Sequence, residues 1–236
     1  KGFNLSEDEM EKFGTLENFE DFFAVQLVIK GFKNLNESIE HFISPDILNE
    51  ENQLYREELS KKVDAEKITR IEKAPPFLVI QLKRFEYNYQ THIRDKIMSP
   101  FSFESSIVIN RLMKNNDPNG DLYYYHLYGI VLHSGTADSG HYSALVRVGK
   151  KWFTFNDSEV EFYCDDEVFD NKIETDFFRS VEQYEPLPYL LFYERIKDQS
   201  ELNNTIKNNN NNNNSENEEK SILTDLAKFV CNEDKQ

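Results

Sequence analysis

The chain has 236 residues, enough for one substantial domain and a tail. Its 43 acidic residues outweigh 27 basic ones, and the net charge of −16 argues against binding to nucleic acid or to an anionic membrane, since both need basic side chains. No apolar run approaches the length of a membrane span, the N-terminus lacks a secretory apolar region, and the only cysteines are Cys164 and Cys231. We therefore expect an intracellular protein of the cytoplasm or nucleus.

The first half of the chain predicts one helix and one buried strand. Residues 35–43 have helical apolar spacing, with Asn34 or Asn36 available as the N-cap and Pro45 just beyond the end. Residues 77–82 form a short apolar run after Pro75 and Pro76, which is typical of a buried strand. Residues 1–14 are charged and weakly patterned, and no element is predicted there.

The second half predicts several strands. The segments 122–132, 142–148, 151–155 and 189–193 are rich in tyrosine and β-branched residues, and Gly149 and Lys150 fit a two-residue hairpin turn. Strands joined largely by hairpins, with helices towards the N-terminus, indicate an α+β fold with an antiparallel sheet.

The end of the chain has a different composition. From Glu201 it is rich in asparagine and charge, with an unbroken asparagine run over residues 208–214. Such a segment buries too little apolar surface to fold alone, so we expect a folded part over residues 1–200 and a disordered tail over 201–236. Within that tail, residues 222–230 are amphipathic enough for a marginal helix.

His141 stands out because it follows a small, glycine-containing loop and opens a strand. If residues 149–150 form a two-residue turn, Val148 faces Lys151 and His141 lies opposite Ser158. Asn156 then sits diagonally beside His141 on the same face, whereas Asp157 belongs to the other face; a turn one residue longer or shorter would exchange the two. Either neighbour could orient the imidazole, as in the base and orienting residue of a catalytic triad.

Several blocks together resemble the ubiquitin-specific proteases, a family of papain-like cysteine deubiquitinases. Residues 125–142 match its histidine box, residues 78–85 and 152–160 match two further blocks, residues 52–67 are similar to its fingers region, and residues 189–195 resemble its last palm strand. The resemblance covers roughly residues 20–196, and the occurrence of these blocks in order is specific.

The resemblance implies a papain-like fold with an antiparallel palm sheet and fingers, and hydrolysis at the C-terminal glycine of ubiquitin. It implies that His141 is the general base, that Asn156 orients it with Asp157 beside it, and that His133 and Tyr142 line the channel for the ubiquitin tail. For His133, a structural role in bracing the loop is as plausible as tail contact. The implied partners are ubiquitin and ubiquitinated proteins, and no cofactor is implied.

The chain departs from the family pattern at the nucleophile. No Asn-x-x-Asn-Thr-Cys box precedes the histidine, Cys164 follows it, and Cys231 lies beyond the asparagine run. We therefore expect a portion of the fold that is incomplete at its N-terminus, whose parent supplies the thiol. A catalytically inactive ubiquitin-binding or scaffold protein is the alternative, and a protease that uses Cys164 is a weak third.

A second departure concerns metal. Many family members carry a Cys-x-x-Cys pair in the fingers, but here those positions are Arg56 and Leu59. Neither side chain is a zinc ligand, so we expect metal-free fingers.

Overall fold

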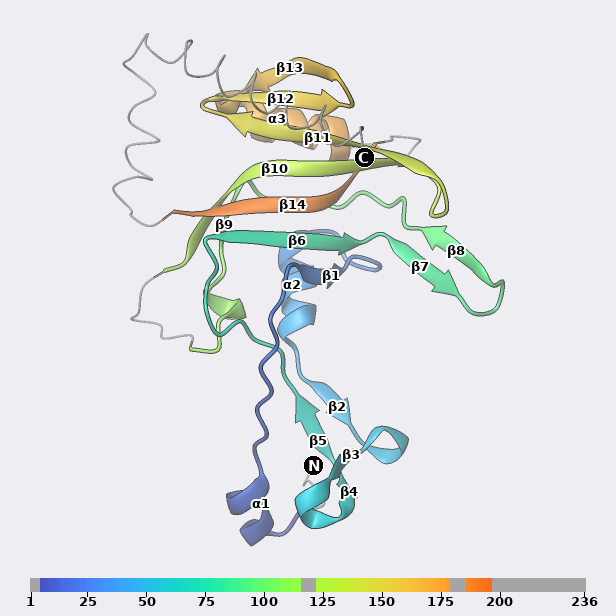
Figure 1. The fold of residues 1–236 in the computed structure, drawn as a ribbon, viewed down its shortest axis with the longest axis vertical. Helices are drawn as coiled ribbons and strands as arrows, with labels where there is room; N and C mark the ends of the chain where they lie inside the picture. Colours follow the sequence, from blue (N-terminus) through green and yellow to red (C-terminus); the bar gives the residue numbers. More distant parts are fainter. Residues whose placement is uncertain (1–4, 116–121, 179–185, 197–236) are drawn as a thin grey trace.

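A computed structural model describes residues 5–115, 122–178 and 186–196. Figure 1 shows a large twisted sheet with a narrower set of short elements extending from it. The sequence predictions for residues 201–236, including the marginal helix at 222–230, lie outside the described residues.

Within the described residues the main sheet has eight strands, in the order β1, β6, β14, β10, β11, β12, β13, with β9 also pairing with β10. Their bounds are β1 Val25–Val28, β6 Phe77–Lys83, β9 Ser106–Val108, β10 Tyr124–Gly135, β11 Gly140–Val148, β12 Lys151–Asn156, β13 Glu159–Asp165 and β14 Leu187–Ile196. The pairings are antiparallel except for β1, which runs parallel to β6. The predicted α+β class with a mostly antiparallel sheet is confirmed, and the parallel edge strand is an addition.

The predicted helix is confirmed as α2 (Leu35–Ile43). Asn34 is its N-cap, because its side-chain oxygen accepts a hydrogen bond from the Glu37 N–H, which satisfies one of the donors left over at a helix start. Leu35 and Ile39 point into the core and join the buried residues of the sheet. A shorter helix, α3 (Phe169–Ile173), stacks Phe169 on the ring of Trp152 in β12, with ring centroids 3.7 Å apart.

Residues 7–13 form a helix that the sequence did not lead us to predict. In α1 (Glu7–Phe13) the Ser6 hydroxyl accepts from the Glu9 N–H while the Glu9 carboxylate accepts from the Ser6 N–H. A serine followed three residues later by a glutamate is the sequence pattern of this capping box, and it could have predicted the start of the helix.

Three two-stranded ribbons complete the description. β2 (Asp46–Leu48) pairs with β5 (Ala65–Lys67), β3 (Leu54–Arg56) with β4 (Lys61–Val63), and β7 (Phe85–Asn88) with β8 (Ile93–Lys96). The first two lie with α1 in the part that extends away from the sheet, and an ion pair between Lys61 and Glu9 joins α1 to β4. The described residues contain no helix that is both long and apolar enough to cross a bilayer.

Candidate active site

His141 lies at the start of β11, next to the tip of the β10–β11 hairpin. Its backbone pairs with Ser134, and one residue further Gly135 pairs with Gly140. The two strands approach very closely here, because a Cβ atom on Gly140 would collide with the His133 ring and the Ser134 carbonyl. Gly135 adopts a φ of 95°, which glycine tolerates best. The two glycines therefore allow the close approach of the strands and the tight loop that place His141 at the end of the sheet.

Asn156, the last residue of β12, holds the imidazole of His141. The predicted hairpin register is confirmed, since Val148 pairs with Lys151 and Ala144 with Phe155. Asn156 Oδ1 lies 2.5 Å from His141 Nε2. The amide oxygen can only accept, so Nε2 is the donor and carries the proton. In this tautomer of the neutral imidazole, Nδ1 is the acceptor nitrogen and takes no part in the bond to Asn156.

Asp157 does not lie where the strand register placed it. It was expected on the opposite face from His141, yet its Oδ2 is 3.9 Å from His141 Nε2. The prediction was wrong because β12 ends at Asn156, so the pair between His141 and Ser158 does not form. Asp157 turns the chain into β13 with a left-handed φ of 51°. Its carboxylate is within ion-pair range of a protonated imidazole but accepts no hydrogen bond from it.

His133 and Tyr142, the predicted channel residues, stand side by side. Their ring centroids are 4.8 Å apart, and the His133 ring also meets Phe85 edge to face at 5.1 Å. Tyr189 from β14 lies 5.9 Å from Tyr142, and the Gln81 amide donates to its hydroxyl. Burial and the neighbouring Tyr189 raise the pKa of Tyr142, so its hydroxyl stays neutral. His133 is buried, so the structure supports bracing as well as a place in the channel wall.

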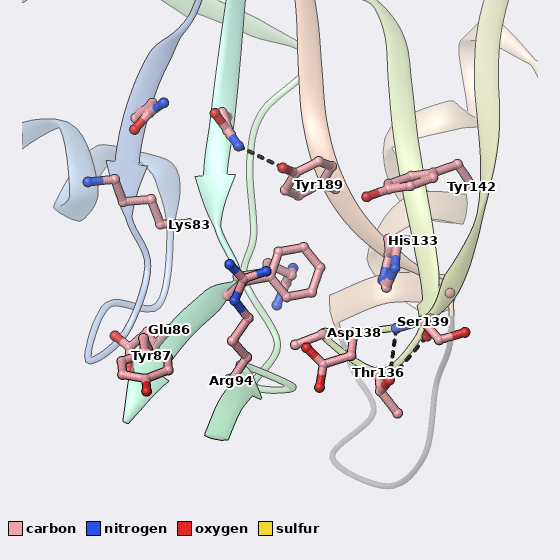
Figure 2. A pocket seen from close by; sticks show the side chains of 16 residues that line it. Lys83, Glu86, Tyr87, Arg94, His133, Thr136, Asp138, Ser139, Tyr142 and Tyr189 are labelled. Atoms are coloured by element: carbon pink, nitrogen blue, oxygen red, sulfur yellow. Dashed lines mark hydrogen bonds between the residues drawn. The ribbon is translucent and has the colours of Figure 1, made fainter. Parts of the chain in front are cut away.

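These aromatic rings form one wall of a cavity of about 730 Å³ (Figure 2). Gly140 and Tyr142, the residues on either side of His141, both line it. The rest of the lining comes from the ends of β1 and β6, from the β7–β8 ribbon and from the loop at 136–139. A cavity of this size beside a histidine can hold an extended stretch of peptide.

Charges of both signs surround the cavity. Lys83, Arg84 and Arg94 supply positive charges, and Glu86 and Asp138 supply carboxylates. Figure 2 shows the Arg94 and Asp138 side chains extending towards the same space from opposite elements. A ligand with alternating apolar and charged side chains therefore has matching groups on the wall.

Cys164 cannot serve as the nucleophile in this fold. It is buried in β13 opposite Trp152, four residues along β12 from Asn156, which is about 13 Å at ordinary strand spacing. Burial raises the pKa of its thiol to about 11, so it is not a thiolate at neutral pH. The weak third hypothesis loses its support. Cys231 lies outside the described residues.

Arg56 and Leu59, the residues on which the expectation of metal-free fingers rests, lie at the end of β3 and in the turn that follows it. Arg56 ends β3 with its side chain buried, and its Nε lies 3.3 Å from a Glu58 oxygen. Among the described residues, no group of three histidine, cysteine, aspartate or glutamate side chains is arranged to hold a metal ion. The absence of zinc stays a prediction.

Two residues that support the site were not predicted from the sequence. Tyr189 lies in a predicted strand, and Arg84 directly follows β6. Arg84 is buried and donates to the carbonyls of Pro188, Ile97 and Ser99. The one signal was a charged residue directly after an apolar strand; its three acceptors are far apart in sequence and could not be foreseen.

Comparison with known proteins gives the family. The family model for ubiquitin carboxyl-terminal hydrolase matches residues 18–193. The chain therefore belongs to the ubiquitin carboxyl-terminal hydrolase family, and the predicted relationship to the ubiquitin-specific proteases is confirmed.

Curated relatives carry the same name. The chain is 30% identical to ubiquitin carboxyl-terminal hydrolase 15 of Saccharomyces cerevisiae over 209 residues, which are 78% of this chain and 17% of that protein. It is also 30% identical to hydrolase 5 of Schizosaccharomyces pombe over 196 residues, covering 79% of this chain and 18% of that protein. The chain thus spans less than a fifth of these relatives.

Solved structures agree with the fold. The SAGA DUB module containing Ubp8 and bound to monoubiquitin matches with a TM-score of 0.56 and 28% identity, over 75% of this chain and 36% of that chain. A yeast SAGA DUB module structure matches with a TM-score of 0.58 at the same identity and coverage. The papain-like fold of the ubiquitin-specific protease type is therefore confirmed for the described part.

Proposed function

We propose that this chain provides the base and the substrate channel of a thiol-dependent deubiquitinase. The single observation that carries the proposal is the 2.5 Å contact between His141 Nε2 and Asn156 Oδ1. Gly140 and Tyr142, the neighbours of His141 in the chain, line the cavity with aromatic walls. An imidazole fixed through Nε2 has Nδ1 available to take a proton, which is the half of a cysteine protease site that activates the thiol.

In the proposed reaction, Nδ1 of His141 takes the proton of a thiol, and the resulting thiolate attacks the carbonyl carbon of the ubiquitin C-terminal glycine. The imidazolium returns its proton to the departing amine as the carbon–nitrogen bond breaks, which leaves a thioester. A water molecule, deprotonated by the same histidine, then attacks the thioester and releases the ubiquitin carboxylate and the thiol. Asn156 keeps the ring in one tautomer throughout.

None of the described residues brings a thiol to His141. Cys164 is buried and distant from His141, and the sequence contains no Asn-x-x-Asn-Thr-Cys box. We propose that the cysteine lies in another part of the parent protein. The partners would be ubiquitin and ubiquitinated proteins, in a reducing compartment such as the cytoplasm or nucleus, where a catalytic thiol stays reduced.

A ubiquitin probe with a thiol-reactive C-terminus tests this proposal. The 236-residue chain alone should form no adduct. Addition of the cysteine-bearing segment, taken from the upstream sequence of its own gene or from a close relative, should yield an adduct and turnover of a fluorogenic ubiquitin substrate. His141→Ala should abolish the turnover. A covalent band on the isolated chain that disappears in Cys164→Ser would overturn the assignment of the nucleophile.

The second candidate is a ubiquitin-binding protein without catalysis. It is favoured by the cavity, which residues of this chain line although none of the described residues brings a thiol to His141. The two candidates differ in one measurement. Binding of ubiquitin by the chain, without turnover after the cysteine-bearing segment is supplied and shown to associate, would favour the binding protein.

A further inference from the structure

The last residue of β8, Lys96, reaches across to the strand that pairs with His141. Its Nζ donates to the carbonyl of His133 at 3.1 Å and to that of Gly135 at 2.9 Å. These two residues flank Ser134, the backbone partner of His141. We propose that Lys96 is a positioning residue that holds the end of β10 and thereby sets the place of the His141 imidazole. The consequence for catalysis rests on the proposed function; the effect on the hairpin does not.

The Lys96 contacts lie at the end of β10, next to the start of β14. β14 pairs with β10 up to His133, which lies opposite Leu187, the first residue of β14. Carbonyls two residues apart on a strand point to the same side. The His133 and Gly135 carbonyls therefore both face Lys96, whose ammonium group continues the hydrogen bonding beyond the start of β14.

Lys96 is itself mounted on a rigid point. The next residue, Ile97, donates its N–H to the Arg84 carbonyl at 2.7 Å and accepts from the Arg84 guanidinium at 2.9 Å. Arg84 also binds the Pro188 carbonyl at 2.7 Å, next to Tyr189. The buried Arg84 guanidinium thus fixes the backbone next to Lys96. The Lys96 ammonium group in turn fixes the carbonyls of β10 by hydrogen bonds.

The contact is strong enough to matter for the hairpin. A hydrogen bond from a charged donor is worth more than a neutral one, and here a single partly buried ammonium group serves two carbonyls. On the other side of the hairpin tip, the loop at 136–139 is held by the Thr136 N–H donating to the Ser139 carbonyl at 2.8 Å. Loss of the Lys96 contacts would let the tip move relative to Asn156, and with it His141.

Amide hydrogen exchange of the 236-residue chain tests the structural half of the inference. Lys96→Met retains the length of the side chain and removes the donor. It should accelerate exchange at residues 133–141 about tenfold, the loss expected for one charge-assisted hydrogen bond, and leave the middle of the β10–β11 ladder unchanged. Lys96→Arg should restore most of the protection. The matched control is Lys73→Met, an exposed lysine away from this site.

Two results would overturn the inference. One is unchanged exchange at residues 133–141 in Lys96→Met. The other is equal acceleration throughout the sheet, which would show that Lys96 contributes only to global stability. If Lys96→Met does not fold, Lys96→Gln replaces it, because glutamine keeps a neutral hydrogen-bond donor. Its amide exchange at residues 133–141 is then compared with exchange in the rest of the sheet in the same way.

Kinetics of the chain supplied with its cysteine-bearing segment test the catalytic half. Lys96→Met should lower kcat roughly tenfold or more with KM changed less than about twofold, because the substrate channel is retained while the base is misplaced. Lys96→Arg should recover kcat. An equal effect on both parameters, or none, would contradict positioning. If the wild-type assembly has no turnover, the proposed function fails, while the exchange experiment still decides whether Lys96 holds the hairpin.

Discussion

At the scale of single residues, the two neighbours of His141 differ in how closely they hold it. Asn156 Oδ1 is 2.5 Å from Nε2, whereas the Asp157 carboxylate, on a largely exposed side chain, is 3.9 Å away. In the assembly with a thiol we expect His141→Ala to lower kcat/KM by roughly a thousandfold or more, and Asn156→Ala by roughly ten- to a hundredfold, because the base remains but loses its orientation.

Asp157→Ala is the matched control for these variants. Its effect on kcat/KM should be smaller than that of Asn156→Ala, since it removes only a screened charge interaction with the imidazolium. Steady-state hydrolysis of a fluorogenic ubiquitin substrate measures all three variants. A larger loss in Asp157→Ala than in Asn156→Ala would mean that the carboxylate is the orienting group, and the roles of the two would be exchanged.

The fingers give a second prediction at this scale. Neither Arg56 nor Leu59 is a zinc ligand, and a structural zinc site needs four ligands, usually cysteine or histidine. We expect no stoichiometric zinc in the purified chain, and no change in its thermal unfolding when a strong chelator is added. Elemental analysis with about one zinc per chain would contradict this.

At the scale of elements, the short strand β9 is joined to β10 through His126. The Nδ1 of His126 lies 2.8 Å from the Ser106 hydroxyl. Burial, with a smaller effect of Arg147, lowers the pKa of His126, while Asp166 and Asp170 act in the opposite direction. The unfolded chain, with an ordinary histidine pKa of about 6.5, therefore binds the proton first as the pH falls.

It follows that His126 stabilises the fold above about pH 6.5 and that this contribution is lost as the pH falls below that value. We expect the free energy of unfolding to decrease as the pH is lowered from 7.5 to 5.5. In His126→Gln the decrease should be smaller, and the two slopes should differ by up to about 1.4 kcal/mol per pH unit, the value for one proton. Urea unfolding at several pH values measures both chains. Identical pH slopes would show that His126 does not titrate with folding.

Much of the element level could be predicted, because it depends on local pattern. The spacing of apolar residues predicted α2, and tyrosine-rich runs predicted the β10, β11 and β12 strands. The two-residue turn predicted the register of β11 with β12. The parallel pairing of β1 with β6 could not be predicted, since it joins segments about 50 residues apart. The side on which Asp157 lies depends on one backbone angle after the strand ends, and the contacts of Lys96 depend on tertiary packing.

At the scale of the whole molecule, the two faces of the sheet differ. One face carries Ile80, Leu191, Ile130, Leu145 and Trp152 into the core, together with residues of α2 and α3. On the other face, residues paired in register form an almost wholly apolar row across six strands: Val79, Phe192, Gly129, Val146, Phe153 and Phe162. Phe162 and Phe77, also on this second face, are 56% and 52% exposed.

Exposed apolar side chains such as Phe77 and Phe162 promote association unless another segment covers them. We therefore expect the 236-residue chain to self-associate despite its charge of −16, and to do so less once the cysteine-bearing segment is bound. The double variant Phe77→Ser and Phe162→Ser should lower the self-association measured by sedimentation velocity, and should weaken dye binding to exposed apolar surface. The matched control is Tyr89→Ser, which removes an aromatic ring that is 82% exposed but lies on the β7–β8 ribbon. If the control lowers association as much as the double variant, or if the wild-type chain stays monomeric as its concentration is raised, the apolar row is not the surface that drives assembly.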